Sequence, residues 1–265
     1  MAFLGEGLWI AASVGWKQEV ERLLTEGADI EEKNHSRYSA LHCASRLGEV
    51  AVVHFLLEKG AKVNVQTNHG ETPLHYAATG AHVTGARRGA HVAIVRMLLD
   101  KGALVHLKTS DGATALHGAA LHGRGAAVQM LLERGADPNL KTKDLWTPLY
   151  VACEAGHCAV VKMLLAQSAD VDAAAKSGVT PLHRAAECGY FAVVKMLLDK
   201  GAELRCRTRK GRNPEDLAIA HGHDEIAFLL RAEATRRAQL FERRVATAMA
   251  QHERRCGREG PGIWK

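Results

Sequence analysis

The sequence predicts an all-α repeat solenoid of helix–turn–helix–hairpin units, with an amphipathic helix at its C-terminal end. Three observations predict this class. A four-residue motif recurs at a fixed period, glycines follow each copy at constant offsets, and the apolar residues between those glycines have helical spacing. Hydrophobic residues make up 47% of the 265 residues but aromatic residues only 5%, so the core must consist mainly of aliphatic side chains.

The motif has a polar first residue in each of its five central copies. These read Ser-Ala-Leu-His, Thr-Pro-Leu-His, Thr-Ala-Leu-His, Thr-Pro-Leu-Tyr and Thr-Pro-Leu-His. With two degenerate copies at the ends, the starts are residues 6, 39, 72, 114, 147, 180 and 213, a step of 33 except for one of 42. Thr is a favourable helix cap and Pro fits the first helical turn, so each copy is expected to begin a helix.

Glycines divide the rest of each unit into two helices and a hairpin. The first helix ends at a glycine about ten residues after the motif starts, as at Gly156. A second helix follows with a Val-Val-x-x-Leu-Leu pattern, as in residues 160–165, and ends at a glycine such as Gly135. An extended arm with turn residues at its tip, such as Asp111-Gly112, completes the unit.

This arrangement resembles the ankyrin repeat family from about residue 5 to 230. The shared motifs are TPLH, Ala-Ala, Gly-His and Leu-Leu-x-x-Gly-Ala. The resemblance implies a curved stack of seven repeats, with hairpins and first helices along a concave face and second helices along the convex back. The end repeats are degenerate: Glu6-Gly7 replaces Thr-Pro, and Glu215-Asp216 replaces Leu-His. Polar changes are expected there because a terminal repeat has one face in water.

The longer step reflects nine extra residues in the third unit. Gly-Ala-His-Val at residues 80–83 recurs at residues 89–92, which indicates a local duplication that leaves residues 81–89 as a bulge between two helices. The bulge is either a tolerated surface loop, since added loop length costs little, or a contact element for a particular partner.

A charged stretch follows the last repeat. We divide the chain into an ankyrin repeat domain over residues 1–230, a C-terminal helix over 231–256 and a flexible tail over 257–265. Apolar and small residues with helical spacing form one stripe of this helix, and arginines lie off it. The stripe is expected to cover the last repeat, or else to dock on a partner helix or an anionic surface. The stripe residues are Ala234, Ala238, Phe241, Val245, Ala248 and His252.

Charge is distributed unevenly along the chain. The formal net charge is +6, yet residues 1–33 hold seven acids and three bases, and residues 232–265 hold eight bases and four acids. The last full hairpin is also basic. Such a cluster is a solvated face, a surface for an acidic protein segment, or a surface for nucleic acid or anionic lipid. Its members are Arg205, Arg207, Arg209, Lys210 and Arg212.

Fifteen histidines invite a metal-binding or catalytic interpretation, but repeat position explains most of them. Those that end the motif are expected to bond within and between repeats, as the resemblance implies. Only residues 221–224, His-Gly-His-Asp, have a spacing that could hold a metal. No HExxH or CxxC pattern occurs, and no nucleophile lies beside a histidine outside the repeat pattern. We therefore expect no catalytic site, cofactor or metal. The motif histidines are His42, His75, His117 and His183, and those at or near the Gly-His position are His91, His157 and His223.

Two further residue types have structural interpretations. The resemblance implies that Asn64 and Asn139 stabilise hairpins, and Cys153 occupies a small core position. The six cysteines have irregular spacing, which favours free thiols in a reducing compartment, hence the cytoplasm or nucleus.

No apolar run approaches the roughly 20 residues of a membrane helix, so no integral membrane segment is expected. We expect a monomer.

Concave positions that the repeat does not require are the candidate partner-binding residues. Trp146 is the strongest of them because sister repeats have Glu71, Ala113 and Val179 there, although it could instead pack on its own hairpin or the next. The sequence thus favours a non-catalytic protein-interaction module, an adaptor or scaffold. Its alternative is electrostatic binding of nucleic acid or anionic membrane by the basic C-terminal end. The candidate residues are Arg37, Tyr38, Arg46, His69, Glu71, Asp111, His122, Asp144, Leu145, Trp146, Glu154, Ser177, Glu187, Arg209, Lys210 and Arg212.

Overall fold

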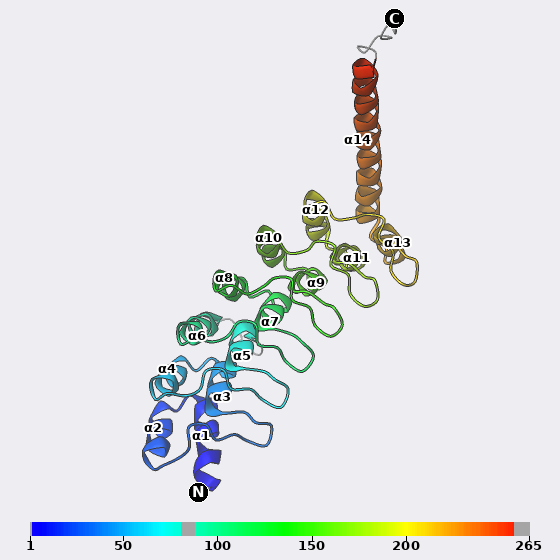
Figure 1. Ribbon diagram of the computed structural model, residues 1–265. Coiled ribbons are helices and arrows are strands. Elements are labelled where there is room, and N and C mark those ends of the chain that lie inside the picture. The colour runs from blue at the N-terminus through cyan, green and yellow to red at the C-terminus, as the bar shows by residue number, and fades with distance from the viewer. Residues whose placement is uncertain (1, 81–87, 257–265) are drawn as a thin grey trace, which may run out of the picture.

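The computed structural model describes residues 2–80 and 88–256. Within these ranges the regular elements are fourteen α-helices, arranged in pairs that stack into an elongated solenoid (Figure 1). The helices form two layers, and the hairpins project on the side of the first layer (Figure 1). The all-α solenoid predicted from the 33-residue period is confirmed.

The first helices of the seven units form one layer. From α3 onward each begins at the motif, because the polar first residue caps the helix; Thr72 and Thr180, for example, accept a hydrogen bond from the backbone N–H three residues on. Alanines along these helices are buried and allow close packing of neighbours. The helices are α1 (Ala2–Val14), α3 (Ala40–Leu47), α5 (Pro73–Thr79), α7 (Ala115–Leu121), α9 (Pro148–Glu154), α11 (Pro181–Glu187) and α13 (Pro214–Ala220).

The second helices form the other layer. Their Val and Leu side chains, such as Val161 and Leu164, are fully buried against the first layer. The core is therefore one continuous aliphatic cluster that runs from Leu8 to Leu230, as stacking requires. The helices are α2 (Lys17–Thr25), α4 (Val50–Glu58), α6 (Arg88–Asp100), α8 (Gly125–Glu133), α10 (Cys158–Ala166), α12 (Phe191–Asp199) and α14 (Asp224–Cys256).

The motif histidines join each unit to the next. In all four, Nδ1 accepts the N–H of the residue that caps the helix, at 3.1–3.2 Å. Nε2 then donates to a backbone carbonyl of the following hairpin, at 3.1–3.4 Å. Burial lowers the pKa of His42 and of His117 to about 4, so the neutral form fits the site. The predicted structural role of these histidines is confirmed.

Other repeat positions behave as the sequence indicated. His91, His157 and His223 each bond through Nε2 to a carbonyl at or near the end of a neighbouring first helix, at 3.0–3.1 Å. Asn64 and Asn139 bridge consecutive hairpins with both amide atoms. His221 lies beside the carbonyl of Leu217, 2.9 Å from Nδ1. The His-Gly-His-Asp segment is therefore engaged in helix contacts.

The hairpins are fixed both internally and to one another. In the fourth, the N–H of Thr142 donates to the carbonyl of Trp146 at 3.0 Å. Backbone bonds also join neighbouring tips, as from Lys143 to Asp111 at 2.8 Å and from Arg209 to Ser177 at 2.9 Å. The tips consequently form a row of fixed spacing along one edge of the solenoid.

The C-terminal helix differs from the expectation in two respects. The α14 helix is continuous from Asp224, so the proposed boundary at residue 230 lies inside it. It also projects beyond the stack (Figure 1), and Phe241 and Val245 are 69% and 40% exposed. The expectation that this stripe covers the last repeat is therefore wrong from residue 238 onward. The reason is length: α12 and α13 end too early to meet the far half of α14.

Two further sequence predictions concern residues outside the described ranges. Most of the predicted bulge, residues 81–87, and the proposed tail, residues 257–265, belong to this group. The last two residues of the bulge lie in the first turn of α6. No helix in the described part of the chain is long and apolar enough to cross a membrane.

Candidate partner-binding groove

Hairpin tips and first helices of successive units border a concave groove with two open hollows. One lies over the second to fourth units, between Arg46, Glu71 and His122. The other lies over the sixth and seventh, between Lys176 and Arg212. Candidate residues from both hairpins and helices line these hollows, so the structure brings them together as a row along the groove and not as one compact site.

A tyrosine cluster occupies the N-terminal part of the groove. The hydroxyl of Tyr76 donates to the carboxylate of Glu71 and lies 2.6 Å from the hydroxyl of Tyr38. Arg46 covers the ring of Tyr38, with its guanidinium 5.8 Å from the ring centroid. Burial, followed by the bond to Glu71, raises the pKa of Tyr76 above its usual range. The two tyrosine rings form an aromatic surface between the charged groups of Arg46 and Glu71, and their hydroxyls are already engaged.

A second aromatic cluster, the tryptophan stack, lies in the fifth and sixth units. The rings of Trp146 and Tyr150 are stacked, with centroids 5.7 Å apart and an interplanar angle of 16°. Arg184 donates to the Tyr150 hydroxyl at 2.9 Å and lies 5.6 Å from its ring centroid. Tyr150 is buried, while Trp146 remains 37% exposed. Packing on its own repeat and availability to a partner are therefore compatible for Trp146.

Two glutamates hold the arginine of this stack. Arg184 lies 2.9 Å from a carboxylate oxygen of Glu187 and 3.4 Å from one of Glu154. All three side chains are at most about one-third exposed. The candidate residues Glu154 and Glu187 thus position Arg184, and the three side chains together carry a net negative charge.

Basic side chains gather at the C-terminal end of the groove. Arg209, Lys210 and Arg212 are exposed on the last full hairpin, and Lys176 on the preceding hairpin lies 3.5 Å from Asp144. We call the hollow that these residues border, with Arg184 and Glu187, the basic pocket.

Two candidate residues have unusual backbone conformations. Arg37 and Leu145 occupy the hairpin position where the other central units have glycine, with φ of 60° and 63°. A side chain in this left-handed region costs roughly 1–2 kcal/mol. Leu145 is also 40% exposed, so packing in the described structure does not account for that cost. Leu145 is therefore a candidate for a functional role.

Sequence reasoning missed three residues of the groove. Tyr76 and Arg184 follow the motif directly, and Tyr150 is the motif's own last residue. A signal was present, because the position after the motif holds Cys, Tyr, Gly, Val and Arg in successive units. A position that varies so widely inside a helix of conserved pattern is not fixed by the core.

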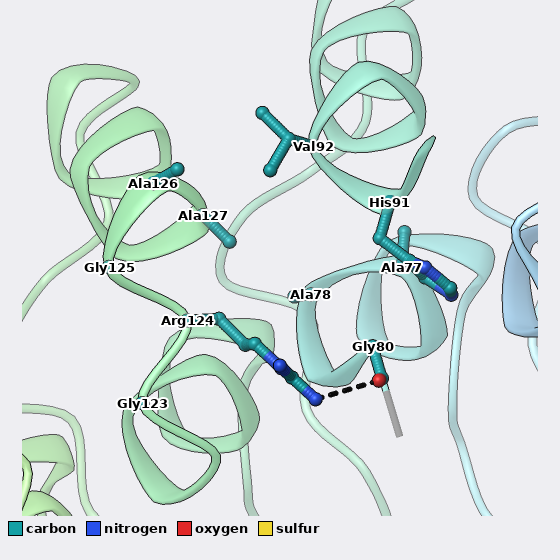
Figure 2. Close-up of a pocket in the computed structure, with 10 residues that line it drawn as sticks. All are labelled: Ala77, Ala78, Gly80, His91, Val92, Gly123, Arg124, Gly125, Ala126 and Ala127. Atoms are coloured by element: carbon teal, nitrogen blue, oxygen red, sulfur yellow. Dashed lines mark hydrogen bonds between the residues drawn. The ribbon is translucent and has the colours of Figure 1, made fainter. Parts of the chain in front are cut away.

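A small apolar pocket of about 180 Å³ lies away from the groove, between α5, α6 and α8 (Figure 2). Arg124 crosses it to donate to the carbonyls of Thr79 and Gly80, at 2.9 and 2.8 Å, in place of the histidine of the Gly-His position. The pocket adjoins the point where residues 81–87 begin, and it contains none of the candidate residues. In the described ranges, no three metal-binding side chains are grouped as a metal site would require.

Comparisons with known proteins agree with this architecture. A family model for ankyrin repeats, spanning three copies, matches residues 8–88, 83–142, 137–208 and 175–238. The crystal structure of the human ASB11 ankyrin repeat domain aligns with a TM-score of 0.74 and 33% identity, over 84% of this chain and 96% of that one. The chain belongs to the ankyrin repeat family. Ankyrin repeats are in general protein–protein interaction modules, and proteins built from them are typically non-catalytic.

Two curated proteins match shorter segments. The human Ankyrin repeat domain-containing protein 39 is 44% identical over 62 residues, which are 23% of this chain and 34% of that protein. The Schizosaccharomyces pombe Ankyrin repeat-containing protein P1E11.10 is 33% identical over 67 residues, 25% of this chain and 32% of that protein. The chain thus matches about a third of the length of these relatives.

Proposed function

We propose that this chain is a non-catalytic adaptor or scaffold that holds a partner protein on the concave face of its repeats. One observation carries the proposal. Leu145 and Trp146 are exposed side by side at a hairpin turn. Leu145 has a left-handed backbone conformation at a position where most other repeats have glycine. Neither residue is needed by the repeat, and aromatic residues are enriched among interface hot spots.

Capture from native cells followed by cross-linking tests the groove. Trp146→Ala and Tyr38→Ala should each lose partners that the wild-type chain retains, and cross-links should map to hairpins and first helices. Phe228→Ala is the matched control, because Phe228 is 73% exposed but lies on α14. If both groove variants keep every partner while Phe228→Ala loses one, the concave assignment is wrong.

Two accompanying proposals concern the state of the protein. We propose that it acts in the cytoplasm or nucleus, which is supported by five described cysteines that are all unpaired as thiols. We also propose that it is a monomer in the absence of its partner. Fractionation and light scattering test these two points respectively.

A second candidate function is electrostatic binding through α14. Its far half exposes Phe241 and Met249 beside Arg243 and Arg244, a combination that suits an anionic membrane or nucleic acid. Binding by this route must weaken steeply with salt and disappear in a chain ending at residue 238. Binding that is insensitive to salt would exclude it.

A further inference from the structure

The two hollows of the groove differ in charge. The hollow over the second to fourth units has Arg46 against the carboxylates of Glu71 and Asp111. The basic pocket is bordered by five cationic side chains and a single carboxylate. The charge therefore changes along the groove, from mixed in the first hollow to positive in the basic pocket. A charged partner consequently has a preferred orientation in the groove. The cationic residues are Lys176, Arg184, Arg209, Lys210 and Arg212, and the carboxylate is Glu187.

The basic residues differ in their availability. Arg184 is engaged by Glu187, and Lys176 lies near Asp144. The three cations of the last full hairpin are exposed, and the ion pairs of the described residues do not include them. Backbone bonds of Arg209 to Ser177 and of Thr208 to Arg212, both 2.9 Å, hold this hairpin in place. The backbone of this hairpin is therefore fixed, and its exposed cations can bind carboxylates.

An apolar surface lies earlier along the same groove. Trp146 exposes part of its ring, and Leu121 on α7 is 42% exposed. His117 donates to the carbonyl of Trp146 at 3.1 Å, and Leu121 lies one helical turn beyond His117 on the same face. Leu121 lines the hollow over the second to fourth units, Trp146 lies on the next hairpin along the groove, and the basic pocket follows toward the C-terminal repeats.

We propose that the partner binds through an extended segment with an apolar side chain on Trp146 and clustered carboxylates in the basic pocket. This inference rests on the proposed function, since it names the chemistry of the partner for the same groove. An acidic peptide fits better than nucleic acid for a physical reason. The carboxylates of Glu154 and Glu187 flank Arg184 beside the tryptophan stack and would repel a continuous phosphate backbone, whereas a peptide can place a neutral residue there.

Fluorescence anisotropy on the full chain tests the proposal. The probe is a labelled peptide with a Leu-Phe pair, a Gly-Ser spacer of varied length and a run of glutamates. One spacer length should bind best, and Arg209→Glu with Lys210→Glu should weaken that binding roughly tenfold or more. The matched control, Arg243→Glu with Arg244→Glu on α14, should leave binding unchanged. A peptide with lysines in place of glutamates should not bind.

Several outcomes would overturn the inference. These are unchanged binding by the Arg209→Glu, Lys210→Glu variant, binding of the lysine peptide, and displacement of the peptide by an oligonucleotide at lower concentration. If Trp146→Ala loses cellular partners while the hairpin variant keeps them, the groove remains the binding site and only its acidic specificity fails. If only the α14 variant loses partners, the proposed function itself fails.

Discussion

One repeat position serves two different purposes in this chain. Four units end the motif with a histidine that ties the helix start to the next hairpin, but the fifth has Tyr150. A tyrosine at this position stacks on Trp146 and accepts hydrogen bonds from Arg184 instead. Tyrosine in place of histidine at this one position thus replaces the bond to the next hairpin by a ring that lies beneath Trp146 in the groove.

At the same scale, one buried group has no partner. Ser45 Oγ is the one buried side-chain nitrogen or oxygen atom without a hydrogen bond among the residues described, and the other units have alanine, cysteine or, in the seventh, isoleucine there. Ser45→Ala removes an unpaired hydroxyl, so it should raise the free energy of unfolding by about 1 kcal/mol in urea titrations. Ser39→Ala, the matched control, should lower it by about 1 kcal/mol, because Ser39 caps α3 and bonds to His42.

Leu145 offers a test of strain against function. Leu145→Gly relieves the left-handed conformation but adds chain entropy, so the free energy of unfolding should rise by about 0.5–1 kcal/mol. The same change should weaken partner binding, since it deletes an exposed side chain beside Trp146. Calorimetry and pull-down on the same preparation check both effects. Increased stability with undiminished binding would remove Leu145 from the candidate site.

The sequence predicted residues well where the repeat dictates them and poorly where it does not. The roles of His42 and Asn64 followed from their repeat positions, because the same bonds recur at equivalent positions in other units. The stack of Trp146, Tyr150 and Arg184 could not be predicted, since it joins two units through side chains that the repeat leaves free. The sixteen candidate residues as a binding set stay a prediction.

At the scale of elements, the motif histidines make the stacking of repeats sensitive to acid. Each buried ring uses Nδ1 as an acceptor and Nε2 as a donor, so protonation adds a second N–H that faces a backbone N–H. Burial lowers the folded-state pKa of these rings, to about 4 for His42 and His117. Above pH ~6.5, where the unfolded residue is also neutral, their contribution to stability is fully present.

Between pH ~6.5 and about 4 the unfolded chain binds a proton that the folded chain excludes, so stability falls as the pH falls. For a shift of this size the loss at pH 5 is about 2 kcal/mol per histidine. Urea midpoints at pH 7 and pH 5 should show this loss in the wild type and a smaller one in His117→Gln. Equal losses in the two chains would mean that His117 titrates normally in the fold.

For the whole molecule, the two ends of the stack are closed differently. The N-terminal repeat is acidic and carries a second helix of ordinary length, α2, whereas the seventh repeat continues into the 33 residues of α14. The period predicted every unit of the stack. The period did not predict that the seventh unit's second helix and the C-terminal helix would be continuous, because the period ends with the seventh unit. The helices are continuous because no glycine separates them and the apolar spacing runs through both.

The point at which α14 leaves the stack is marked by Arg237. Its guanidinium donates to the carbonyls of Ala202 and Leu198, at 2.7 and 3.1 Å, and to Glu233. These carbonyls belong to the end of α12 and the residues after it, so Arg237 provides a side-chain cap for that helix. Beyond Arg237 the helix is exposed. We therefore expect that removal of this exposed part abolishes any partner binding by α14 without lowering the stability of the stack.

A chain that ends at Ala238 should therefore melt at the same temperature as the full chain, although it lacks the exposed stripe. A chain that ends at Leu230 loses the cap and should be less stable by about 2 kcal/mol, a few degrees in the melting temperature. Arg237→Ala should reproduce most of that loss, whereas Arg236→Ala should not, because the hydrogen bonds of Arg236 go to Glu233 alone. Thermal denaturation of these four variants and the full chain checks this. If the chain ending at Ala238 is as unstable as the shorter one, the far half of α14 packs on the stack in solution.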